Sequence, residues 1–354
     1  MAPTIVAVQP RVLPDEFNPQ LLVDVMTDDG LTGIGECWWG LSRPTLSQAG
    51  PVAPIASMIG DILAPLSVGR DASSIEAIWD ALVRQTYQYG HEGIVLTALS
   101  GLDLALWDLA GQRAGVPTAE LLGEVVHRSM PVYASLSWLR DEGRVRADAA
   151  RAVEAGIRGV KLHEFDPELA HAVREEVGPD VAIMVDVNGH FDSVSAAVSV
   201  GRRLAEADVL WFEEPVWPMR DHDALAQVRV GAGLPIAAGE NEFALESFAR
   251  LLSAAAVDIL QPEIAKFGGL TPAREIARLA DEHDVAICPH NYSMGPSWYA
   301  SLHWAAVSPG ARWLEMPWLP EGMSFPSGVE LPEVVDGMVA LPAEPGLGTK
   351  WPRP

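Results

Sequence analysis

The chain has 354 residues, of which 49% are hydrophobic, and a formal net charge of −24 at pH 7. This length exceeds what one small hydrophobic core usually serves, so we expect two domains, or one large barrel with an accessory domain. The negative charge argues against nucleic acid as a partner, because phosphate binding depends on clustered Lys and Arg.

Two features of the sequence bear on its compartment. The first residues, MAPTIVAVQP, lack the charged-then-apolar layout of a secretion signal, and no stretch approaches the roughly 18 uninterrupted apolar residues of a membrane span. The two cysteines, Cys37 and Cys288, lie far apart without a CxxC pattern, which is typical of buried thiols in a reducing compartment. We therefore expect a cytoplasmic protein without a membrane partner.

The first part of the chain reads as strands followed by helices. The segments TIVAVQPRVL and QLLVDVMTDDGLTGIGE predict strands between residues 4 and 36, with a hairpin turn at Asp28-Asp29-Gly30. GLTGIGE mimics a dinucleotide-binding GxGxxG only weakly and has no strand–helix context, so we interpret it as part of the hairpin. The stretch from Thr97 to Pro117 predicts a helix that stops at Gly115. We expect an α+β capping domain over residues 1–127.

After residue 128 short apolar strands alternate with amphipathic helices. The candidate strands, whose centres recur at roughly 23–27 residues, are PVYASLS, GVKLH, AIMVDVN, VLWFEEP, PIAAGE, DILQPE, VAICPHN and RWLEMP. A doubly wound open sheet shows the same alternation, but the number of strands favours an α/β fold of the (β/α)₈, TIM-like barrel type over residues 128–317. The Pro- and Gly-rich residues 318–354 suit a C-terminal tail that packs back on the capping domain.

Three consecutive predicted strands end in an acid. Asp186, Glu213 and Glu240 follow one another at intervals of 27 residues. In a barrel the carboxyl ends of the strands carry the active site, so these hard oxygen donors converge and predict a Mg²⁺ site. Any one of them alone would read as a helix N-cap or a solvated loop charge. Asn188 stands two residues beyond Asp186 and faces the barrel axis if the strand persists, whereas Glu214 points away, toward a neighbouring strand.

Candidate bases lie on strands that flank these acids. Lys161 and His163 form a K-x-H pair, and the period of two in a strand directs both side chains into the barrel mouth. His290 ends the strand CPHN, and Glu263 of the preceding strand is expected to fix its tautomer. The two histidines then address opposite faces of a bound substrate; the alternative for each is a structural histidine.

Other polar and aromatic residues complete the predicted mouth. Glu315 closes the last strand, where it either joins the site or pairs with Arg312. Lys266 either approaches the mouth or lies in the following turn. Trp38 and Trp39 either close over a substrate or pack between domains, and specificity is expected from the first-domain loops 15–20 and 37–43.

The sequence resembles the mandelate racemase and muconate-lactonising branch of the enolase superfamily over nearly its whole length. The resemblance is carried, in order, by TDDGLTGIGE, LSGLDLALWDLAGQRAGVPTAELLG, VKLH, VDVN, WFEEP, AGEN, QPEIAKFGGLT, CPHN, WLE and PGLG. Two positions depart from the mandelate racemase pattern. His163 stands where that enzyme has a second lysine, and Glu263 stands where an aspartate is usual, which argues against mandelate racemase activity itself.

The resemblance implies a set of roles. Carried over, these are Mg²⁺ binding by Asp186, Glu213 and Glu240, contact with the substrate carboxylate by Lys161, acid/base catalysis by His163 and His290, and a hydrogen bond to the enolised carboxylate from Glu315. The remaining substrate contacts are expected from Asn188, Lys266, Trp38 and Trp39.

The expected reaction removes the proton α to the carboxylate of a small molecule, with Mg²⁺ stabilising the enolate. We expect dehydration of a sugar acid first; racemisation or epimerisation and cycloisomerisation stay open. A non-catalytic metal-binding barrel is disfavoured because every expected polar position is filled. A two-metal hydrolase is disfavoured because YASLS lacks an H-x-H pair. Twelve tryptophans suggest buried subunit surface, and members of this family are commonly oligomers, so we expect a homo-oligomer.

Overall fold

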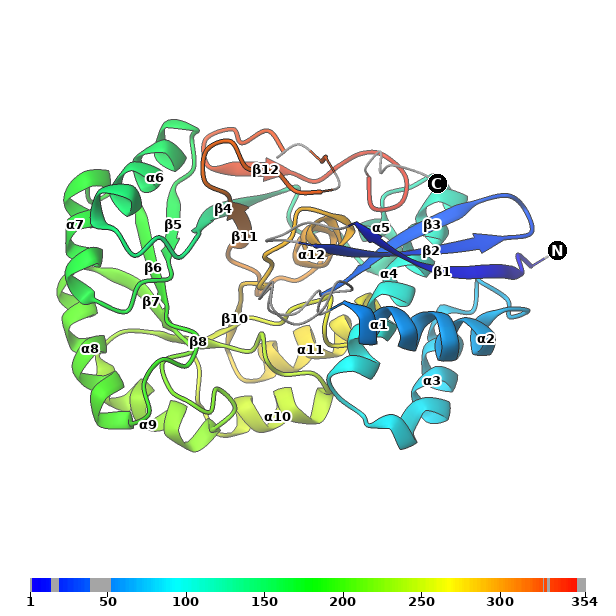
Figure 1. The fold of residues 1–354 in the computed structure, drawn as a ribbon, viewed down its shortest axis with the longest axis horizontal. Coiled ribbons are helices and arrows are strands. Elements are labelled where there is room, and N and C mark those ends of the chain that lie inside the picture. The colour runs from blue at the N-terminus through cyan, green and yellow to red at the C-terminus, as the bar shows by residue number, and fades with distance from the viewer. Residues whose placement is uncertain (1, 14–18, 39–51, 327, 330–331, 349–354) are drawn as a thin grey trace.

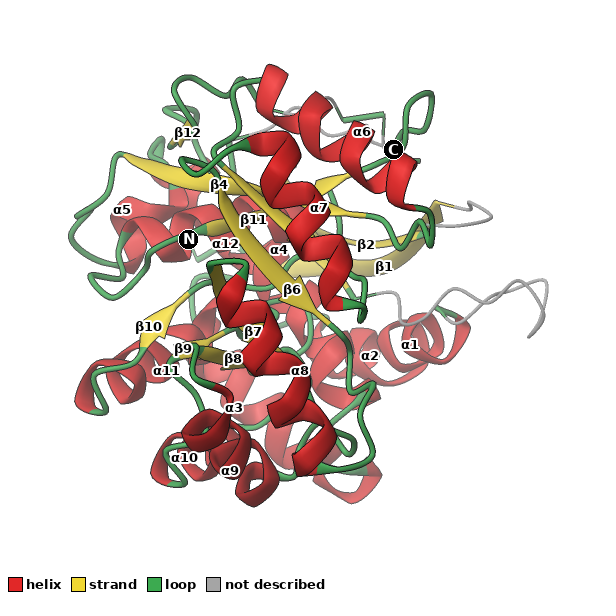
Figure 2. Cartoon of the chain, turned by 90° about the vertical axis from the view of Figure 1, so that its left-hand side faces the viewer, coloured by secondary structure: helices red, strands yellow, loops and turns green. Residues whose placement is uncertain are grey.

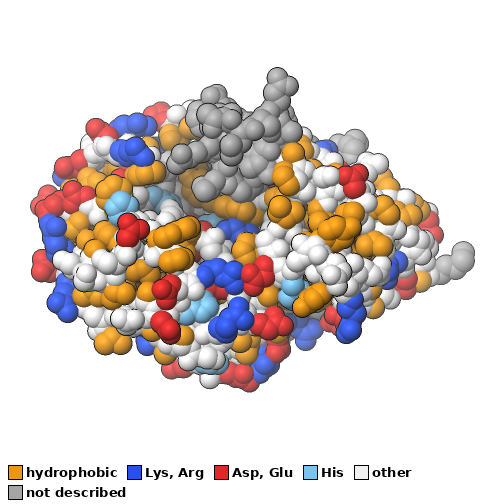
Figure 3. Space-filling view, turned by 60° about the horizontal axis from the view of Figure 1, so that its bottom comes forward, with side chains coloured by type: hydrophobic (Ala, Val, Ile, Leu, Met, Phe, Trp, Pro, Cys, Tyr) orange, Lys and Arg blue, Asp and Glu red, His pale blue; other side chains and the backbone are white. Residues whose placement is uncertain are grey.

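The computed structural model describes residues 2–13, 19–38, 52–326, 328–329 and 332–348. The N-terminal sheet and its helices lie at one end of the molecule, and the parallel strands with their outer helices lie at the other (Figure 1). Acidic and basic side chains are interspersed over the face seen in Figure 3.

The capping region begins with an antiparallel sheet of order β1-β2-β3, formed by β1 (Ile5–Leu13), β2 (Gln20–Thr27) and β3 (Thr32–Cys37). The predicted hairpin joins β2 to β3: Gly30 has a φ of 84° and donates its N–H to the carbonyl of Thr27. The helical segments that follow are α1 (Ala53–Ser57), η1 (Met58–Leu63), α2 (Ala64–Ser67), α3 (Ile75–Thr86), η2 (Tyr87–Tyr89), α4 (Ile94–Ala114) and α5 (Thr118–Leu122).

Helix α4 is the predicted long helix, and it ends at Gly115 in the left-handed conformation, with a φ of 71°. By length and composition it could cross a membrane, which the sequence analysis did not anticipate, but nearly all of it is buried in the fold. It packs on β3 and α11. A Cβ on Gly35 of β3 would lie 1.9 Å from the carbonyl oxygen of Gly101, so the glycine permits this close approach.

Eight parallel strands form the barrel. They are β4 (Ser129–Leu136), β5 (Gly159–Leu162), β6 (Ala182–Asp186), β7 (Val209–Glu213), β8 (Ile236–Ala238), β9 (Ile259–Leu260), β10 (Ala286–Ile287) and β11 (Leu314–Trp318). Neighbours pair in chain order and β11 pairs with β4. A bridge from Ile287 to Ala311, just before β11, completes the ring. All eight predicted strands are therefore present.

Seven helices connect the strands: α6 (Glu142–Glu154), α7 (Pro167–Val177), α8 (Val194–Glu206), α9 (His222–Ala232), α10 (Leu245–Ser253), α11 (Leu270–Glu282) and α12 (Pro296–Ala306). Figure 2 shows α6, α7 and α8 on the outside of the strands. Within the described residues no helix follows β11, which leads directly into the Pro- and Gly-rich tail. Prolines at 317, 320 and 326 disfavour one there, since proline lacks the N–H that a helix interior needs.

The C-terminal tail returns to both parts of the molecule. Strand β12 (Met338–Ala340) pairs antiparallel with the first residues of β4 (Figure 1). Gly346 forms a bridge with Pro117, and the N–H of Leu347 donates to Asp108 of α4. The tail therefore contacts a barrel strand through β12, and Pro117 and Asp108 of the capping region through Gly346 and Leu347.

The interior of the barrel is filled by a compact cluster of side chains from five strands or strand ends, namely Tyr133, Met184, Trp211, Ala237 and Cys288. Alternation along each strand places these apolar residues below the polar ones that follow. Cys37 and Cys288 are both buried free thiols, as expected.

Candidate active site

The three predicted acids meet at the carboxyl ends of adjacent strands. One oxygen from each of Asp186, Glu213 and Glu240 lies within 4.8 Å of the others, and all three side chains are buried. Asp186 and Glu213 are the last residues of β6 and β7 and pair in register, whereas Glu240 stands two residues beyond the end of β8. The three acids therefore converge as their spacing predicted, although β8 is shorter than predicted.

Two side chains that the sequence analysis did not single out hold Glu213 in place. Trp211 Nε1 donates to Glu213 Oε2 at 3.0 Å, and Gln261 Nε2 donates to the same oxygen at 2.7 Å. Both are fully buried. Each stands two residues before an acid, in WFE and QPE, so the period of two was a signal that could have found them.

Asn188 was predicted to face the barrel axis if the strand continued to this residue, and the strand does not continue. β6 ends at Asp186, and Asn188 lies in the following turn with a φ of 44°, where it is exposed. Its backbone N–H and its Nδ2 nevertheless both donate to the Asp186 carboxylate, at 2.9 Å and 3.2 Å. It therefore contacts the predicted ligand by another route.

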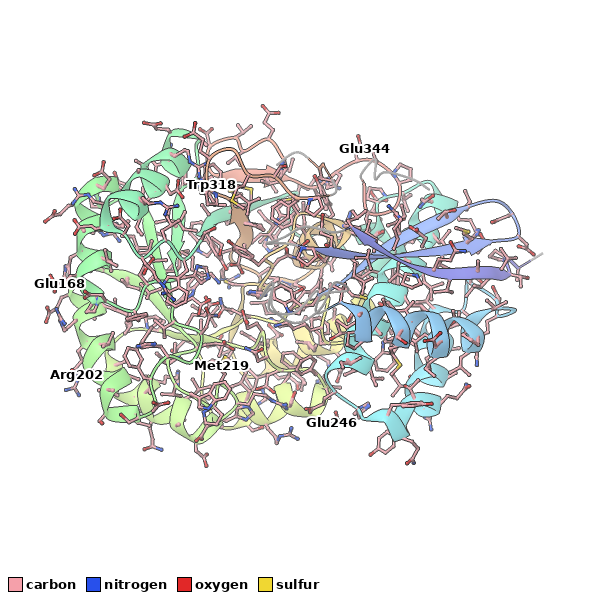
Figure 4. The ribbon with its side chains drawn as sticks, viewed as in Figure 1. Glu168, Arg202, Met219, Glu246, Trp318 and Glu344 are labelled. Carbon is pink, nitrogen blue, oxygen red and sulfur yellow. The ribbon has the colours of Figure 1, made fainter. Side chains whose placement is uncertain are left out.

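Glu214 points toward a neighbouring strand end, as predicted, where Asn241 Nδ2 donates to both its oxygens. Asn241 Nδ2 also lies 3.3 Å from Glu240 Oε1 and 3.2 Å from the sulfur of Met219, which Figure 4 labels. Burial and the charge of Glu240 raise the pKa of Glu214 well above its ordinary value. Asn241 thus joins this second carboxylate to the cluster.

His163 is anchored by the barrel backbone. Its Nδ1 lies 2.6 Å from the carbonyl oxygen of Leu136 on β4, and since a carbonyl only accepts, Nδ1 carries the hydrogen. Its Nε2 then faces Asp186 Oδ2 at 3.4 Å. Burial opposes the charged ring, but the hydrogen bond and charge of Asp186 outweigh it, so the pKa of His163 is raised.

Lys161 lies at the centre of the acids and is completely buried. Its Nζ is 2.8 Å from both Glu213 Oε1 and Glu315 Oε1, and 3.5 Å from Asp186 Oδ2. Burial would lower the pKa of Lys161, but these carboxylates raise it well above its ordinary value. The ammonium is therefore held in its charged form.

Glu315 takes part in the site instead of pairing with Arg312. Its Oε2 accepts the backbone N–H of Asn291 at 3.0 Å, while its Oε1 faces Lys161. Arg312 donates to the backbone carbonyls of Pro309 and Ala311. The alternative of an Arg312–Glu315 ion pair is therefore wrong.

His290 is anchored by side chains. Its Nδ1 lies 2.8 Å from Glu263 Oε2, so the longer Glu side chain does reach the ring, and Glu263 Oε1 accepts the N–H of Ala265. Its Nε2 lies 2.8 Å from Glu240 Oε2. Burial opposes the charged ring, but the charges of Glu240 and Glu315 raise the pKa of His290 well above its ordinary value.

Lys266 and Trp38 lie beside His290 at the mouth. Lys266 Nζ donates to the carbonyl of Glu240 at 3.0 Å and lies 4.5 Å from the centre of the Trp38 ring. Trp38, from the end of β3, places its ring edge-on to His290 at 5.3 Å. Lys266 therefore lies at the mouth itself, while Trp39 and most of the two predicted specificity loops lie outside the described residues.

The charge of this buried cluster fits a divalent cation. The buried carboxylates of the site are Asp186, Glu213, Glu214, Glu240, Glu263 and Glu315, and the buried lysines among them are Lys161 and Lys266. Burial and the neighbouring Asp186 raise the pKa of Glu213 to about 7, which shows how strongly the acids crowd one another. Three convergent carboxylates with hard oxygen donors are a ligand set for a divalent metal ion.

Family models match both parts of the chain. The model of the mandelate racemase / muconate lactonizing enzyme N-terminal domain matches residues 15–123, and the model described as enolase C-terminal domain-like matches residues 144–353. The chain belongs to the mandelate racemase / muconate lactonizing enzyme family. This confirms the resemblance seen in the sequence and the fold class it implied.

Relatives in this family act on sugar acids or their lactones by name. The chain is 36% identical to the D-galactarolactone cycloisomerase of Agrobacterium fabrum, with 94% of this chain and 89% of the relative covered. It is 32% identical to the D-xylonate dehydratase of Haloferax volcanii, with 94% and 84% covered. Among solved structures, the 3,6-anhydro-D-galactonate cycloisomerase of Zobellia galactanivorans matches with a TM-score of 0.87, 29% identity and coverage of 98% and 96%.

Proposed function

We propose that this enzyme is a Mg²⁺-dependent sugar-acid dehydratase, which removes the proton α to a carboxylate and then eliminates the β-hydroxyl as water. One observation carries the proposal. Two histidines, His163 and His290, flank a buried cluster of three carboxylates, and each ring has Nδ1 anchored and Nε2 directed at the cluster. Two such groups supply the base and the acid that a dehydration needs.

Asp186, Glu213 and Glu240 would hold the metal. When bound, Mg²⁺ neutralises negative charge that develops on the substrate carboxylate as the α-proton leaves. Trp211 and Gln261 fix one oxygen of Glu213 and leave the other toward the centre of the cluster. All three proposed ligands are carboxylates, whose hard oxygen donors suit Mg²⁺.

The remaining residues bind the substrate and move protons. Lys161 binds the substrate carboxylate with its buried ammonium. Glu315 must carry a proton to hydrogen-bond the enolised form; burial favours the protonated acid, but the charges of Lys161 and His290 lower the pKa of Glu315 in the free site. His163 Nε2 takes the α-proton, because its Nδ1 hydrogen is committed to Leu136. His290, oriented by Glu263, gives a proton to the departing hydroxyl. The proposed further substrate contacts are Asn188, Lys266, Trp38 and Trp39.

Cycloisomerisation is the second candidate, and the 36% identity to a D-galactarolactone cycloisomerase favours it. In that case one histidine would serve the ring-forming or ring-opening step instead of protonating a leaving hydroxyl. Racemisation or epimerisation uses the same proton abstraction with return to the opposite face. All three share the first step, so the product distinguishes them.

A product screen tests the function. The panel is arabinonate, D-xylonate, D-galactonate, L-rhamnonate, galactarate and D-galactarolactone, each with Mg²⁺, scored for 2-keto-3-deoxy acid with semicarbazide and followed by NMR in D₂O. We expect a semicarbazide-positive product from at least one open acid, abolished by EDTA and restored by Mg²⁺. Lactone opening without a keto product would establish the cycloisomerase instead. Full turnover by metal-free protein would remove the metal-dependent mechanism.

We also propose domain limits near residues 127 and 317, a cytoplasmic location and a homo-oligomeric state. Support comes from the change of architecture at β4, from the two buried free thiols, and from the twelve tryptophans. Sedimentation at micromolar concentration checks the last point, and a clean monomer of 38.0 kDa would contradict it.

A further inference from the structure

A buried carboxylate of the capping region, Glu36 on β3, reaches across to the barrel. Its side chain is almost completely inaccessible to solvent, and it accepts four hydrogen bonds. Gln20 Nε2 and Ser293 Oγ donate to Oε1 at 2.9 Å and 2.5 Å, and the N–H and Oγ of Ser297 donate to Oε2 at 3.1 Å and 2.8 Å. The barrel partners are Ser293, in the loop between β10 and α12, and Ser297, in the first turn of α12. Glu36 is not one of the two proposed proton-transfer groups. The burial of its carboxyl group therefore needs another explanation.

Glu36 takes the place of an N-cap for α12. The N-cap residue of that helix, Gly295, has no side chain to accept the free N–H groups of the first turn, and Ser297 is the second residue of the helix. A carboxylate at a helix N-terminus is favoured by those N–H groups and by the helix dipole. Helix α12 of the barrel therefore has a first-turn N–H accepted by a side chain of the capping region.

Gly295 makes room for this contact. A Cβ at this position would lie 2.2 Å from Glu36 Oε2 and 2.9 Å from Gln20 Nε2. Its φ of −165° is ordinary extended backbone, so the glycine is required by space and not by conformation. The loop thus cannot supply its own N-cap side chain without displacing Glu36.

A chain of hydrogen bonds leads from this cap to the site. The N–H of Ser293 donates to Asn291 Oδ1, and Asn291 Nδ2 donates to Ser297 Oγ, so the loop is closed on itself around the Glu36 contact. The N–H of Asn291 then donates to Glu315. His290 is the residue before Asn291, and Trp38, two residues after Glu36 on the same strand end, contacts the His290 ring.

We infer that Glu36 is a positioning residue: by capping α12 from the capping region it fixes the loop 290–297, and with it His290 and the Asn291 N–H. The inference rests on the proposed function for the role of His290, but the ordering of the loop does not. The contact links the seating of the capping region to one of the two proton-transfer groups. The hydrogen bonds of this chain do not include His163, whose Nδ1 is held by the carbonyl of Leu136; the His163 ring meets the same loop only through an edge-on contact with Tyr292, at 6.2 Å between ring centres.

Hydrogen–deuterium exchange on the full-length protein tests the ordering without any substrate. Glu36→Gln replaces one of the two acceptor oxygens by an NH₂ group that can only donate, so amide exchange in residues 289–298 should rise about tenfold or more, as for a lost helix cap. Peptides that cover β5 and β6 should keep their wild-type rates. The matched control is Asp24→Asn, another buried capping-region carboxylate, which pairs with Arg11 on β1 and should leave both segments unchanged.

Kinetics on the panel acid with the highest turnover test the consequence for His290. Glu36→Gln should lower kcat for product about tenfold with KM within threefold of wild type, while α-proton exchange with D₂O continues. Ser293→Ala, which removes one donor from the loop, should act in the same direction to a smaller extent if Glu36→Gln does not fold. The inference is overturned if amide exchange of residues 289–298 does not change. It is also overturned if product formation and α-proton exchange of the substrate fall in parallel. If no panel acid turns over, the proposed function fails, and amide exchange still decides the role of Glu36.

Discussion

The two histidines of the site are held in different ways. His163 hydrogen-bonds the backbone of β4, a neighbouring strand of the same barrel. His290 depends on the side chain of Glu263 and on a loop that Glu36 and Trp38 contact from the capping region. One side of the site is therefore intrinsic to the barrel, and the other is completed only where the two parts of the molecule meet.

The carboxylate cluster serves both His163 and His290. A change in the cluster should therefore lower α-proton exchange and product formation together. Glu213→Gln leaves a neutral amide facing three donors, from Lys161, Trp211 and Gln261. We expect product formation and α-proton exchange to fall together by at least about 10³-fold, since several kcal/mol of charge stabilisation are lost. Titration calorimetry with Mg²⁺ should show weakened binding, with the circular dichroism spectrum unchanged.

The control for this change is Glu206→Gln at the exposed end of α8, which should bind Mg²⁺ and turn over as wild type. Wild-type metal affinity in Glu213→Gln would contradict the assignment of this ligand.

Replacing the histidines separately should expose the difference most clearly. His163→Ala should lose both dehydration and α-proton exchange by roughly 10²-fold or more, because the proposed base is gone. His290→Asn should lose dehydration to a similar extent but keep exchange. NMR in D₂O with the panel acid measures both. If both variants kept full product formation, the acid/base assignment would be wrong, and Lys161 or Lys266 would become the next candidate base.

A smaller effect is expected from Glu263, which orients His290 without touching the substrate. Glu263→Gln should slow dehydration by roughly 10–100-fold, less than loss of the acid itself, and leave α-proton exchange within a few-fold of wild type. Glu263→Asp tests the unusual length of this side chain and should recover part of the activity. Equal loss of both readouts in Glu263→Gln would place Glu263 in the common machinery instead of on the His290 side.

The last prediction concerns the far half of α12 and leaves catalysis at neutral pH untouched. His303 is buried and its Nδ1 accepts the N–H of Ala119 in α5, so protonation would break this bond. Burial lowers the pKa of His303 to about 4, below the ordinary 6.5 of an unfolded chain. The unfolded state then binds more protons between these values, and stability is lost as the pH falls through this window.

At pH 5 this loss amounts to about 2 kcal/mol of unfolding free energy. Urea unfolding at pH 7 and pH 5 should show a smaller acid-induced loss in His303→Asn, whose Oδ1 can accept in place of Nδ1. The same acid-induced loss in both proteins would contradict the prediction.

What could be predicted from the sequence differs between the barrel and its contact with the capping region. Period-two alternation placed Lys161 and His163 correctly, and equal spacing found the three acids, because these groups lie on or just past regular strands. Asn188 was placed by extending a strand that in fact ends at Asp186. Trp211 and Gln261 obey the same alternation, which could have found them, but they carry no charge and were therefore not singled out.

The Glu36 contact could not be predicted in this way. It joins residues 257 and 261 positions apart, across two architectures, and no periodicity connects them. The pairing of Glu263 with His290 was predictable because neighbouring barrel strands bring their ends together, whereas the seating of one domain on another follows from packing that a single sequence does not reveal.

The space at Gly295 has a consequence for exchanging parts between relatives. A separate family model matches residues 15–123, so the capping region can be treated as a module for exchange between relatives. Here the acceptor for the first-turn N–H groups of α12, the last helix between barrel strands, is Glu36 of that module. A graft whose β3 lacks an acid at the position of Glu36 would leave the N–H of Ser297 without a partner, and a barrel with any side chain at 295 would reject a module that has the acid. Positions 36 and 295 should therefore travel together in any functional chimera.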